Sequence, residues 1–247
     1  MSRTLTLPSV RIFTAAEMAA VSLYPDEKKP FCAIDVGCDH AKLSAYLIQS
    51  GICSHVYASD INQGPVEVAR RNLKERSFNG KTLDNYIDVV QTDGLNGFEK
   101  IKAERIFILG MGGELIASIL KDAEFVRTKE NAGKIGFVLQ PMTSEETLRQ
   151  YLYTNGYKIL DENLVLDKGR VYSVMLALYD GISRQTSRAG YLLGDINIQK
   201  RTELFERQLA RRIRITKKAV NQLDTVGKCD NELSALLKEL KSLEMHN

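Results

Sequence analysis

The stretch at residues 31–43 constrains the fold of this chain more than any other. Its first part, residues 31–36, is an apolar, β-prone run that ends at Gly37. After the glycine the apolar residues follow helical spacing, with Leu43, Leu47 and Ile48 on one face. This pattern predicts a buried strand, a tight turn and a helix. In open α/β folds such a turn lies at the carboxyl edge of a parallel sheet, where ligands bind.

Three ionisable side chains give this turn its chemistry, namely Asp35, Asp39 and His40. A dinucleotide-binding loop would have the glycine pattern G-x-G-x-x-G at this place. The carboxylates of this turn would repel a pyrophosphate but would attract a cation. S-adenosylmethionine has no phosphate and carries an ammonium group and a sulfonium centre, so the turn favours it as the ligand. An ordinary strand-to-helix connection is the alternative.

Composition indicates a globular protein of ordinary type. The chain has 247 residues, of which 44% are hydrophobic and 26% charged. The first residues lack the charged-then-apolar pattern of a signal peptide, and no apolar run approaches the roughly 20 residues needed to cross a bilayer. We therefore expect a cytoplasmic protein with no membrane contact. The cysteines at positions 32, 38, 53 and 229 lack the spacing of metal sites, so we expect free thiols and no bound metal.

Charge divides the chain into two parts. Residues 181–247 hold 13 Lys and Arg against 8 Asp and Glu, a net charge of +5, whereas residues 1–180 hold 21 against 23, a net charge of −2. We expect one domain over residues 1–180 and a basic helical domain over residues 181–247. A basic domain suits a polyanionic partner. A solvated helical hairpin that happens to be basic is the alternative.

A second strand is predicted over residues 54–60 and ends in Asp60. Asp60 lies 23 residues after Gly37, close to the offset at which an acidic residue of a Rossmann-like unit binds the ribose hydroxyls. We assign Asp60 and the adjacent Ile61 to cofactor binding. The alternative is that Asp60 caps the next helix, which is expected over residues 66–78.

A third strand, expected over residues 86–91, leads into Asp93 and Gly94. A carboxylate at the end of this strand suits a hydrogen bond from the adenine amino group of the cofactor. An aspartate that only shapes the turn before a glycine is the alternative.

The fourth predicted strand, residues 105–109, is followed by Gly110, Met111, Gly112 and Gly113. Three glycines in four residues let the backbone approach a ligand closely. The loop is interpreted either as a phosphate-binding nest or as the floor beneath a transferable methyl group. We assign Gly110 and Met111 to the cofactor and the last two glycines to the substrate.

Two more polar side chains are candidates for substrate binding. The fifth predicted strand, residues 135–139, is stopped by Pro141, which leaves Gln140 at the edge of the sheet in a position to read a base. A helix is expected near the N-terminus, over residues 9–24, beside the sheet or over the site. Its Arg11 faces a substrate or only the solvent.

A hairpin closes the alternating part of the chain. Residues 159–166 and 171–179 are predicted as strands joined by a tight turn. Five alternating β/α units closed by such a hairpin form the doubly wound pattern of class I methyltransferases, whose seventh strand runs antiparallel to the others. We therefore predict an α/β fold with a Rossmann-like methyltransferase sheet.

The tail contains two apolar seams with heptad-like spacing. The first consists of Phe205, Leu209, Ile213, Thr216, Val220 and Leu223, and the second of Leu233, Leu236, Leu240 and Leu243. Between them, residues 227–231 supply a glycine and capping residues that end one helix and start another. These features predict a C-terminal antiparallel two-helix coiled coil. Its first helix carries a basic run that includes Arg207, Arg211 and Arg214.

Four motifs together are similar to those of the bacterial tRNA (adenine(22)-N(1))-methyltransferase family, TrmK. They are D-V-G-C-D-H-A-K-L at 35–43, D-G-L at 93–95, G-M-G-G at 110–113 and L-Q-P at 139–141. The resemblance covers nearly the whole chain. Members typically have D-x-G-[ST]-D-H-A-x-L, from which Cys38 departs, and Ser44 replaces a frequent proline. The family's L-S-x-R-L segment is kept only approximately, at residues 7–11.

The resemblance implies transfer of a methyl group from S-adenosylmethionine to N1 of adenine 22 in tRNA. It places Asp35 and Gly37 at the cofactor, and Asp39 and His40 at the mouth of the methyl pocket as catalytic residues. The fourth strand lacks the D/N-P-P-Y/F signature of many exocyclic-amine methyltransferases, which favours a ring nitrogen as the methyl acceptor. A methyltransferase for another RNA or a small molecule and a non-catalytic RNA-binding relative are the alternatives. We expect a monomer or a weak dimer.

Overall fold

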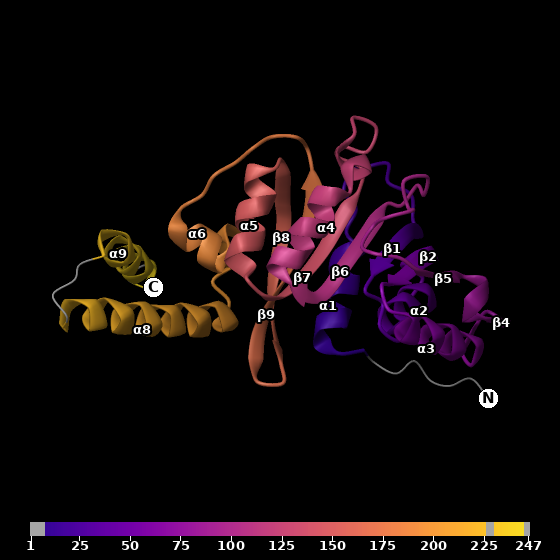
Figure 1. Cartoon of the computed structure of the whole chain (residues 1–247), viewed down its shortest axis with the longest axis horizontal. Coiled ribbons are helices and arrows are strands. Elements are labelled where there is room, and N and C mark those ends of the chain that lie inside the picture. Colours follow the sequence, from indigo (N-terminus) through magenta and orange to yellow (C-terminus); the bar gives the residue numbers. More distant parts are fainter. Residues whose placement is uncertain (1–7, 226–229, 245–247) are drawn as a thin grey trace.

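The computed structural model describes residues 8–225 and 230–244, which form a seven-stranded sheet flanked by helices, with a helical tail to one side (Figure 1). The strand order is β5-β2-β1-β6-β7-β9-β8. In that order the strands are Ile87–Gln91, Cys53–Asp60, Phe31–Val36, Arg105–Gly112, Gly136–Thr143, Arg170–Tyr179 and Tyr157–Asp167. The predicted α/β, Rossmann-like sheet is confirmed.

Strand direction decides where a site can form. The pairs of β1 with β2 and β6, of β2 with β5 and of β6 with β7 are parallel, whereas β9 runs antiparallel to both β7 and β8. The predicted antiparallel closing strand is therefore confirmed. The β8–β9 hairpin turns at Lys168 and Gly169, whose positive φ angles of 48° and 78° suit a two-residue hairpin loop. Since the five parallel strands share a direction, their carboxyl ends meet at one edge.

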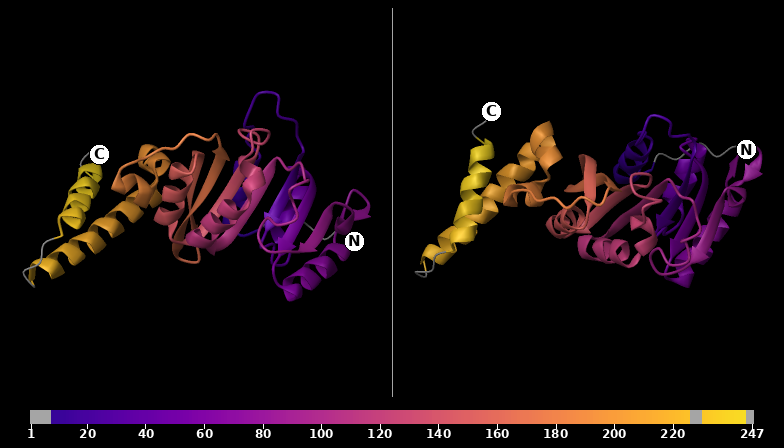
Figure 2. Two further views of the ribbon diagram at one scale, coloured as in Figure 1. Left: turned by 45° about the horizontal axis from the view of Figure 1, so that its top comes forward. Right: turned by 90° about the horizontal axis from the view of Figure 1, so that it is seen from above.

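Helices cover both faces of the sheet (Figures 1 and 2). The five that do so are α1 (Val10–Ala19), α2 (Lys42–Gln49), α3 (Gln63–Lys74), α4 (Gly113–Asp122) and α5 (Glu145–Thr154). The first three share one hydrophobic cluster with Phe107 and Val138, and the last two share another with Ile108 and Phe137. Neighbouring strand residues belong to opposite clusters because side chains alternate along a strand.

Four predicted boundaries were wrong. Strand β6 continues to Gly112 rather than ending at residue 109, because Met111 and Gly112 still pair with β7. Helix α1 ends at Ala19 rather than near residue 24. Helix α3 occupies residues 63–74 rather than 66–78, since residues 77–78 pair with 81–82 in a small hairpin. Strand β7 continues through Pro141 to Thr143, because the proline lies opposite Met111 at an irregularity of the ladder, where a missing N–H is tolerated.

Arg105 explains where α1 ends. Its Nε donates to the carbonyl of Ala19 at 2.9 Å and its Nη2 to that of Val21 at 2.8 Å. Both its Nη atoms also bind the carboxylate of Glu27, at 2.6 and 2.9 Å, and the guanidinium lies 3.9 Å from the centre of the Phe31 ring. The arginine and glutamate side chains are fully buried. Arg105 thus fastens the connection between α1 and β1 to the start of β6.

Several short elements escape the sequence prediction. They are β3 (Ser77–Phe78), β4 (Lys81–Thr82), the 3₁₀ turns η1 (Leu83–Asn85) and η2 (Glu124–Arg127), α6 (Arg188–Leu193) and α7 (Asp195–Lys200). Each is shorter than the stretch over which the period of its kind of element can be recognised, roughly 11 residues for a helix and roughly four for a strand.

The tail consists of α6, α7 and two longer helices, α8 (Glu203–Thr225) and α9 (Asn231–Glu244). Helices α8 and α9 lie side by side and are in contact (Figure 2). Phe205, Leu209, Leu236 and Leu240 from the two predicted seams are buried in one cluster, together with residues of α6. The turn predicted at residues 227–231 falls largely outside the described residues, as does Cys229.

A buried arginine joins the tail to the sheet. Arg149 of α5 donates to Glu162 of β8 at 2.6 Å and to the hydroxyl of Ser173 of β9 at 3.0 Å. Its Nη1 donates to the carbonyls of Tyr191 and Leu192 in α6 at 2.8 and 3.1 Å.

In the part of the chain that is described, no helix has both the length and the apolar character for crossing a membrane.

Candidate active site

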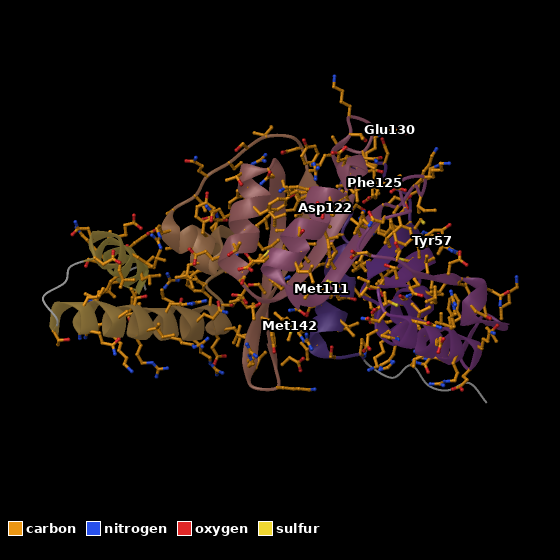
Figure 3. The ribbon with its side chains drawn as sticks, viewed as in Figure 1. Tyr57, Met111, Asp122, Phe125, Glu130 and Met142 are labelled. Carbon is orange, nitrogen blue, oxygen red and sulfur yellow. The ribbon has the colours of Figure 1, made fainter. Side chains whose placement is uncertain are left out.

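A cleft of about 880 Å³ opens at the carboxyl edge of the sheet. It is lined by the β1–α2 turn, the start of α1, the side of α2, the end of α3, the tip of the β8–β9 hairpin and the ends of β6 and β7. The lining residues are Pro8, Ser9, Arg11, Ile12, Asp35, Gly37, Cys38, Asp39, His40, Lys42, Leu43, Tyr46, Gln49, Asn72, Glu75, Arg76, Ser77, Leu109, Gly110, Gln140, Asp167 and Lys168. Met111 and Met142 lie toward this edge and Phe125 and Glu130 toward the opposite one (Figure 3).

The β1–α2 turn has an unusual backbone. Gly37, Asp39 and Ala41 have φ angles of +74°, +50° and +55°. Two left-handed residues that are not glycine carry a conformational cost, which concentrates at functional sites. The positive φ favours glycine at position 37, and a Cβ there would require the flexible end of the Met111 side chain to move. The backbone N–H groups of Gly37 and Cys38 donate to the carbonyl of Ser59, each at 2.8 Å, which holds the turn against β2.

Asp35 sits at the inner end of the cleft and is almost completely buried. Its carboxylate accepts a hydrogen bond from the Ser44 hydroxyl at 2.6 Å. Burial raises the pKa of the Asp35 carboxyl to about 6, against the hydrogen bonds from Ser44, which lower it. A buried carboxylate with so little compensation is a ready partner for a cation.

Asp39 and His40 lie nearer the mouth, with 66% and 41% of their side chains exposed. His40 Nε2 and Asp39 Oδ1 are 3.4 Å apart. The backbone carbonyl of His40 accepts a hydrogen bond from the Asn72 side chain at 3.3 Å. The buried Nδ1 atom of the His40 ring has no hydrogen-bond partner among residues 8–225 and 230–244. The two side chains therefore present polar atoms to a molecule entering the cleft.

Asp60 lies at the end of β2, where one carboxylate oxygen accepts from the backbone N–H of Asn62 at 2.9 Å. The residue in the N-cap position of α3 is Asn62, so Asp60 precedes the cap. Ile61 is 57% exposed. Asp93 is exposed in the turn after β5, and its neighbour Gly94 has a φ of +55°. These four residues sit at the ends of β2 and β5, beside the described lining of the cleft rather than in it.

The glycine-rich segment that was predicted as a loop lies at the end of β6, which runs to Gly112, and at the start of α4. Gly110 lines the cleft with a φ of +78°, and a Cβ there would meet nothing within 4 Å. Gly113 begins α4, and a Cβ on it would lie 2.3 Å from the Ser144 carbonyl oxygen, so this glycine is required by packing. Gly112 and Gly113 are absent from the cleft lining, and their assignment to the substrate stays a prediction.

Arg11 is brought to the cleft by three elements. Its Nε binds Asp167 at the hairpin tip at 2.7 Å and its Nη1 binds the Gln140 side-chain oxygen of β7 at 3.0 Å. The guanidinium also lies 5.0 Å from the centre of the Tyr172 ring. Gln140 is buried and donates to the Pro141 carbonyl at 2.7 Å, so both ends of its amide are engaged within the protein. Asp167 and Gln140 therefore fix the position of the Arg11 guanidinium.

A family model described as "TrmK: tRNA (adenine(22)-N(1))-methyltransferase" matches residues 33–245. The chain belongs to this family. It is 31% identical over 213 residues to the tRNA (adenine(22)-N(1))-methyltransferase of Bacillus subtilis, covering 83% of this chain and 84% of the relative. Its reaction is therefore methylation of N1 of adenine 22 in tRNA by S-adenosylmethionine, as the sequence motifs predicted.

Solved structures of related proteins have the same fold. The B. subtilis tRNA methyltransferase TrmK superposes with a TM-score of 0.75 at 28% identity, over 96% of this chain and 95% of that one. A Streptococcus pneumoniae protein in complex with S-adenosyl-L-methionine, described as a putative tRNA (m1A22) methyltransferase, shares the fold, with a TM-score of 0.77 at 22% identity over 96% and 99% of the two chains.

The residues at the carboxyl edge of this methyltransferase fit the cofactor. A buried carboxylate at Asp35 suits an ammonium group, and the carboxylate of Asp60 has one oxygen on Asn62 and a second for a ribose hydroxyl. Within the described ranges, no group of three or more His, Cys, Asp or Glu side chains is placed to hold a metal ion. Cys32, Cys38 and Cys53 are free thiols.

The three predicted tRNA-binding arginines of the tail differ in their surroundings. Arg207 is 60% exposed and paired with Glu203, one turn away, at 2.6 Å. Arg211 is exposed, and its charge, together with that of Arg212, acts on the carboxylate of Glu145 at the start of α5. Arg214 lines a shallow hollow on α8 with Lys217 and Lys218.

Sequence reasoning missed Ser44 and Asp167 as parts of the site. Ser44 reaches Asp35 across nine positions, from the first turn of α2 back to the strand. Asp167 is 156 residues away from Arg11, and the sequence around it indicates only a turn. No sequence signal connects either pair, because both contacts are made by tertiary packing.

Proposed function

We propose that methyl transfer takes place at the inner end of the cleft, between the β1–α2 turn and Gly110. The observation that carries this proposal is the buried Asp35 carboxylate beneath a turn with strained backbone, at the point where the cleft meets the ends of β1 and β6. Strain at such a place is retained when the rest of the fold fixes a geometry that function needs.

The cofactor is held by the ends of three neighbouring strands. Asp35 binds its ammonium group, Asp60 its ribose diol and Asp93 its adenine amino group. Gly37, Gly94 and Gly110 keep the backbone close to it, and Ile61 and Met111 contribute apolar contact. S-adenosylmethionine supplies the methyl group when bound. The chain's own part is to fix its position and exclude water.

The substrate side is formed by Asp39, His40, Arg11 and Gln140, with Gly112 and Gly113 beside them. Adenine N1 lies on the Watson–Crick edge, so a paired target must first leave its stack, at a cost of a few kcal/mol. Neutral N1 already has an in-plane lone pair, so positioning supplies much of the acceleration, for which roughly 7–11 kcal/mol is available. The Asp39 carboxylate orients the adenine amino group or stabilises the cationic product, and His40 hydrogen-bonds beside it.

The two domains of the chain have different roles. Residues 1–180 form the catalytic domain and residues 181–247 a tRNA-docking domain, in which α8 and α9 make an antiparallel two-helix coiled coil. The contact between α8 and α9 and the shared burial of their seams support this arrangement. Arg207, Arg211 and Arg214 bind phosphates of the tRNA. The enzyme acts in the cytoplasm, where its tRNA substrate is matured, as a monomer or a weak dimer, which light scattering over a range of concentrations tests.

The overall test is nucleoside mapping. Incubation with unmodified tRNA and labelled cofactor is expected to place the label on N1 of adenine 22. Label elsewhere in tRNA or on a small molecule would support a different methyltransferase, and no label a non-catalytic RNA-binding relative. S-adenosylhomocysteine is expected to raise the melting temperature of the protein, and NAD is not.

The catalytic role of Asp39 has its own test. Asp39→Ala is expected to lose most turnover while the protein stays folded, because the side chain is exposed and its removal leaves no buried gap. Single-turnover rates with saturating cofactor separate chemistry from binding. A wild-type rate in this variant would falsify the assignment.

A further inference from the structure

The cleft is longer than the methyl site requires. Its lining runs along α2 from Lys42 in the first turn to Gln49 in the last, which for eight residues is about 12 Å. Beyond Gln49 it reaches Arg76 and Ser77 after α3, where the Gln49 side chain binds the Ser77 carbonyl at 3.5 Å. Its volume of about 880 Å³ lies near the upper end of the range for ligand pockets. We call the part outside the β1–α2 turn, along α1 and α2, the outer groove.

Three cations face the outer groove from three elements. They are Lys42 on α2, Arg76 after α3 and Lys168 at the hairpin tip. Over residues 8–225 and 230–244, none of the three is in an ion pair or a side-chain hydrogen bond, whereas Arg11 in the same lining is paired with Asp167. Of the acidic residues that line the cleft, Asp35 and Asp39 flank the β1–α2 turn and Asp167 is paired with Arg11, which leaves Glu75 as the unpaired acid of the groove. An excess of unpaired cations along a cleft suits a chain of phosphates.

An aromatic pair lies beside the groove. Tyr46 lines the cleft from α2, and its ring centre is 6.3 Å from that of Phe13 of α1, which is 40% exposed and adjoins the lining without belonging to it. Part of the Phe13 ring is therefore open to a ligand at the rim of the groove. Exposed aromatic rings beside cations are the means by which proteins bind unpaired RNA, since every base can stack on them.

These observations lead to one conclusion about the substrate. We propose that the outer groove binds the unpaired stretch of RNA that carries the target adenine, with its phosphates at Lys42, Arg76 and Lys168 and a neighbouring base stacked on Phe13. The proposal rests on the proposed function and adds the path of the RNA chain. Residues from the hairpin tip, α1, α2 and the segment after α3 line one and the same cleft, so the path is continuous.

The first test measures the salt dependence of tRNA binding. In full-length protein saturated with S-adenosylhomocysteine, the triple variant Lys42→Gln, Arg76→Gln, Lys168→Gln is expected to flatten the slope of log K against log[salt] by about two units, at roughly 0.7 per phosphate on a single strand. The matched control is Lys100→Gln, Lys102→Gln, Lys129→Gln, which removes three exposed charges from loops that precede β6 and β7 at the opposite edge. Its slope is expected to stay at the wild-type value.

The second test concerns Phe13 and uses a short single-stranded oligoribonucleotide. Phe13→Ala is expected to weaken its binding roughly 5- to 150-fold, the effect of losing one base stack. Phe13→Tyr keeps a ring and is expected to bind as the wild type does, whereas Phe13→Leu keeps apolar bulk and is expected to bind as the alanine variant does. Equal binding by the leucine and tyrosine variants would overturn the stacking role.

The proposed function and the proposed role of the outer groove can be disproved independently of each other. Nucleoside mapping with the wild type decides the proposed function, whatever the variants do. If the wild type methylates adenine 22 and the triple variant keeps its slope and affinity, the groove proposal is wrong and the function stands. A melting-temperature rise with S-adenosylhomocysteine in every variant confirms that each is folded and binds cofactor.

Discussion

Carboxylates at the strand ends dominate the site at the scale of single residues, and their surroundings give them different properties. Asp35 is buried with Ser44 as its hydrogen-bond donor, Asp60 is held on one side by Asn62, and Asp39 is exposed on a strained turn. In the site that we propose, the same side chain serves as a cation partner, a diol acceptor and a contact for the substrate, because solvent access differs among the three.

Cofactor affinity should depend on pH through Asp35. The pKa of this carboxyl is raised to about 6, mainly by burial, so the group is neutral below that pH and charged above it. Only the charged form attracts an ammonium group. S-adenosylhomocysteine binding, measured by calorimetry, is therefore expected to strengthen as pH rises from 5 to 7 and then level off.

Two variants check the origin of this pH dependence. Asp35→Asn is expected to bind weakly with no change between pH 5 and 7. Ser44→Ala removes a hydrogen bond that favours the charged form, so the midpoint of the transition is expected to move to higher pH. The thiol of Cys38, in the same turn, has its pKa raised by burial and by Asp35, so it stays neutral throughout this range. An identical pH profile in Asp35→Asn would remove Asp35 from the cofactor site.

The ribose role of Asp60 predicts a loss of cofactor affinity on truncation. Asp60→Ala is expected to weaken S-adenosylmethionine binding by ~1.5–3 kcal/mol, since a charge-assisted acceptor is lost. Equilibrium titration measures this. Asp88→Ala on the neighbouring strand, an exposed aspartate bound to His55, is the control and is expected to leave affinity unchanged. An unaltered dissociation constant in Asp60→Ala would sink the ribose assignment.

At the scale of elements, the position of α1 is decided by a contact far from the cleft. Helix α1 supplies Arg11 to the cleft and places Phe13 beside it, while the C-terminal end of the helix is bound by Arg105, which also pairs with Glu27. All five N–H groups of the Arg105 guanidinium are engaged by carbonyls or by Glu27. The buried pair is therefore part of how the site is assembled.

Breaking this pair should be strongly destabilising. Arg105→Met leaves the Glu27 carboxylate buried without its partner and is expected to lower the free energy of unfolding by about 3–5 kcal/mol. Urea denaturation measures the change. The double variant Arg105→Met, Glu27→Gln removes the unpaired charge and is expected to recover part of the loss. Equal losses in single and double variants would mean that packing, not charge, sets the cost.

At the scale of the whole molecule, the tail is tied to the catalytic sheet through a buried arginine. Arg149 links α5, β8, β9 and α6, so α8 leaves the sheet from a fixed start. The charge of Arg211 on α8 acts on Glu145 at the first residue of α5, close to the carboxyl edge. The first half of α8 therefore lies close enough to the start of α5 for their charges to interact.

The tail's part in tRNA binding can be separated from cofactor binding. Replacing Arg207, Arg211 and Arg214 together with glutamine is expected to flatten the salt slope of tRNA binding by about two units and to leave S-adenosylmethionine affinity unchanged. Arg207, being paired with Glu203, contributes least. Lys238→Gln with Lys241→Gln on α9 serves as a control. An unchanged slope, with unchanged mass by light scattering, would leave tRNA binding to the catalytic domain.

The sequence by itself determined what depends on local pattern. The strand-turn-helix at residues 31–49, the alternation of strand residues between two clusters and the apolar seams of the tail each follow from the period of a strand or a helix. The motifs at residues 35–43, 93–95, 110–113 and 139–141 sufficed to identify the family, because they are short local patterns that can be read directly from the sequence.

Only the tertiary structure decided what depends on distant contacts. Arg11 meets Asp167 across 156 positions, and Arg105 ends a helix that begins 95 residues before it. Pro141 does not end β7, because the ladder is already irregular opposite Met111. The outer groove is made of α1, α2, the end of α3 and a hairpin tip, which no sequence period relates. The packing of the whole hydrophobic core holds these elements side by side and so brings their side chains together.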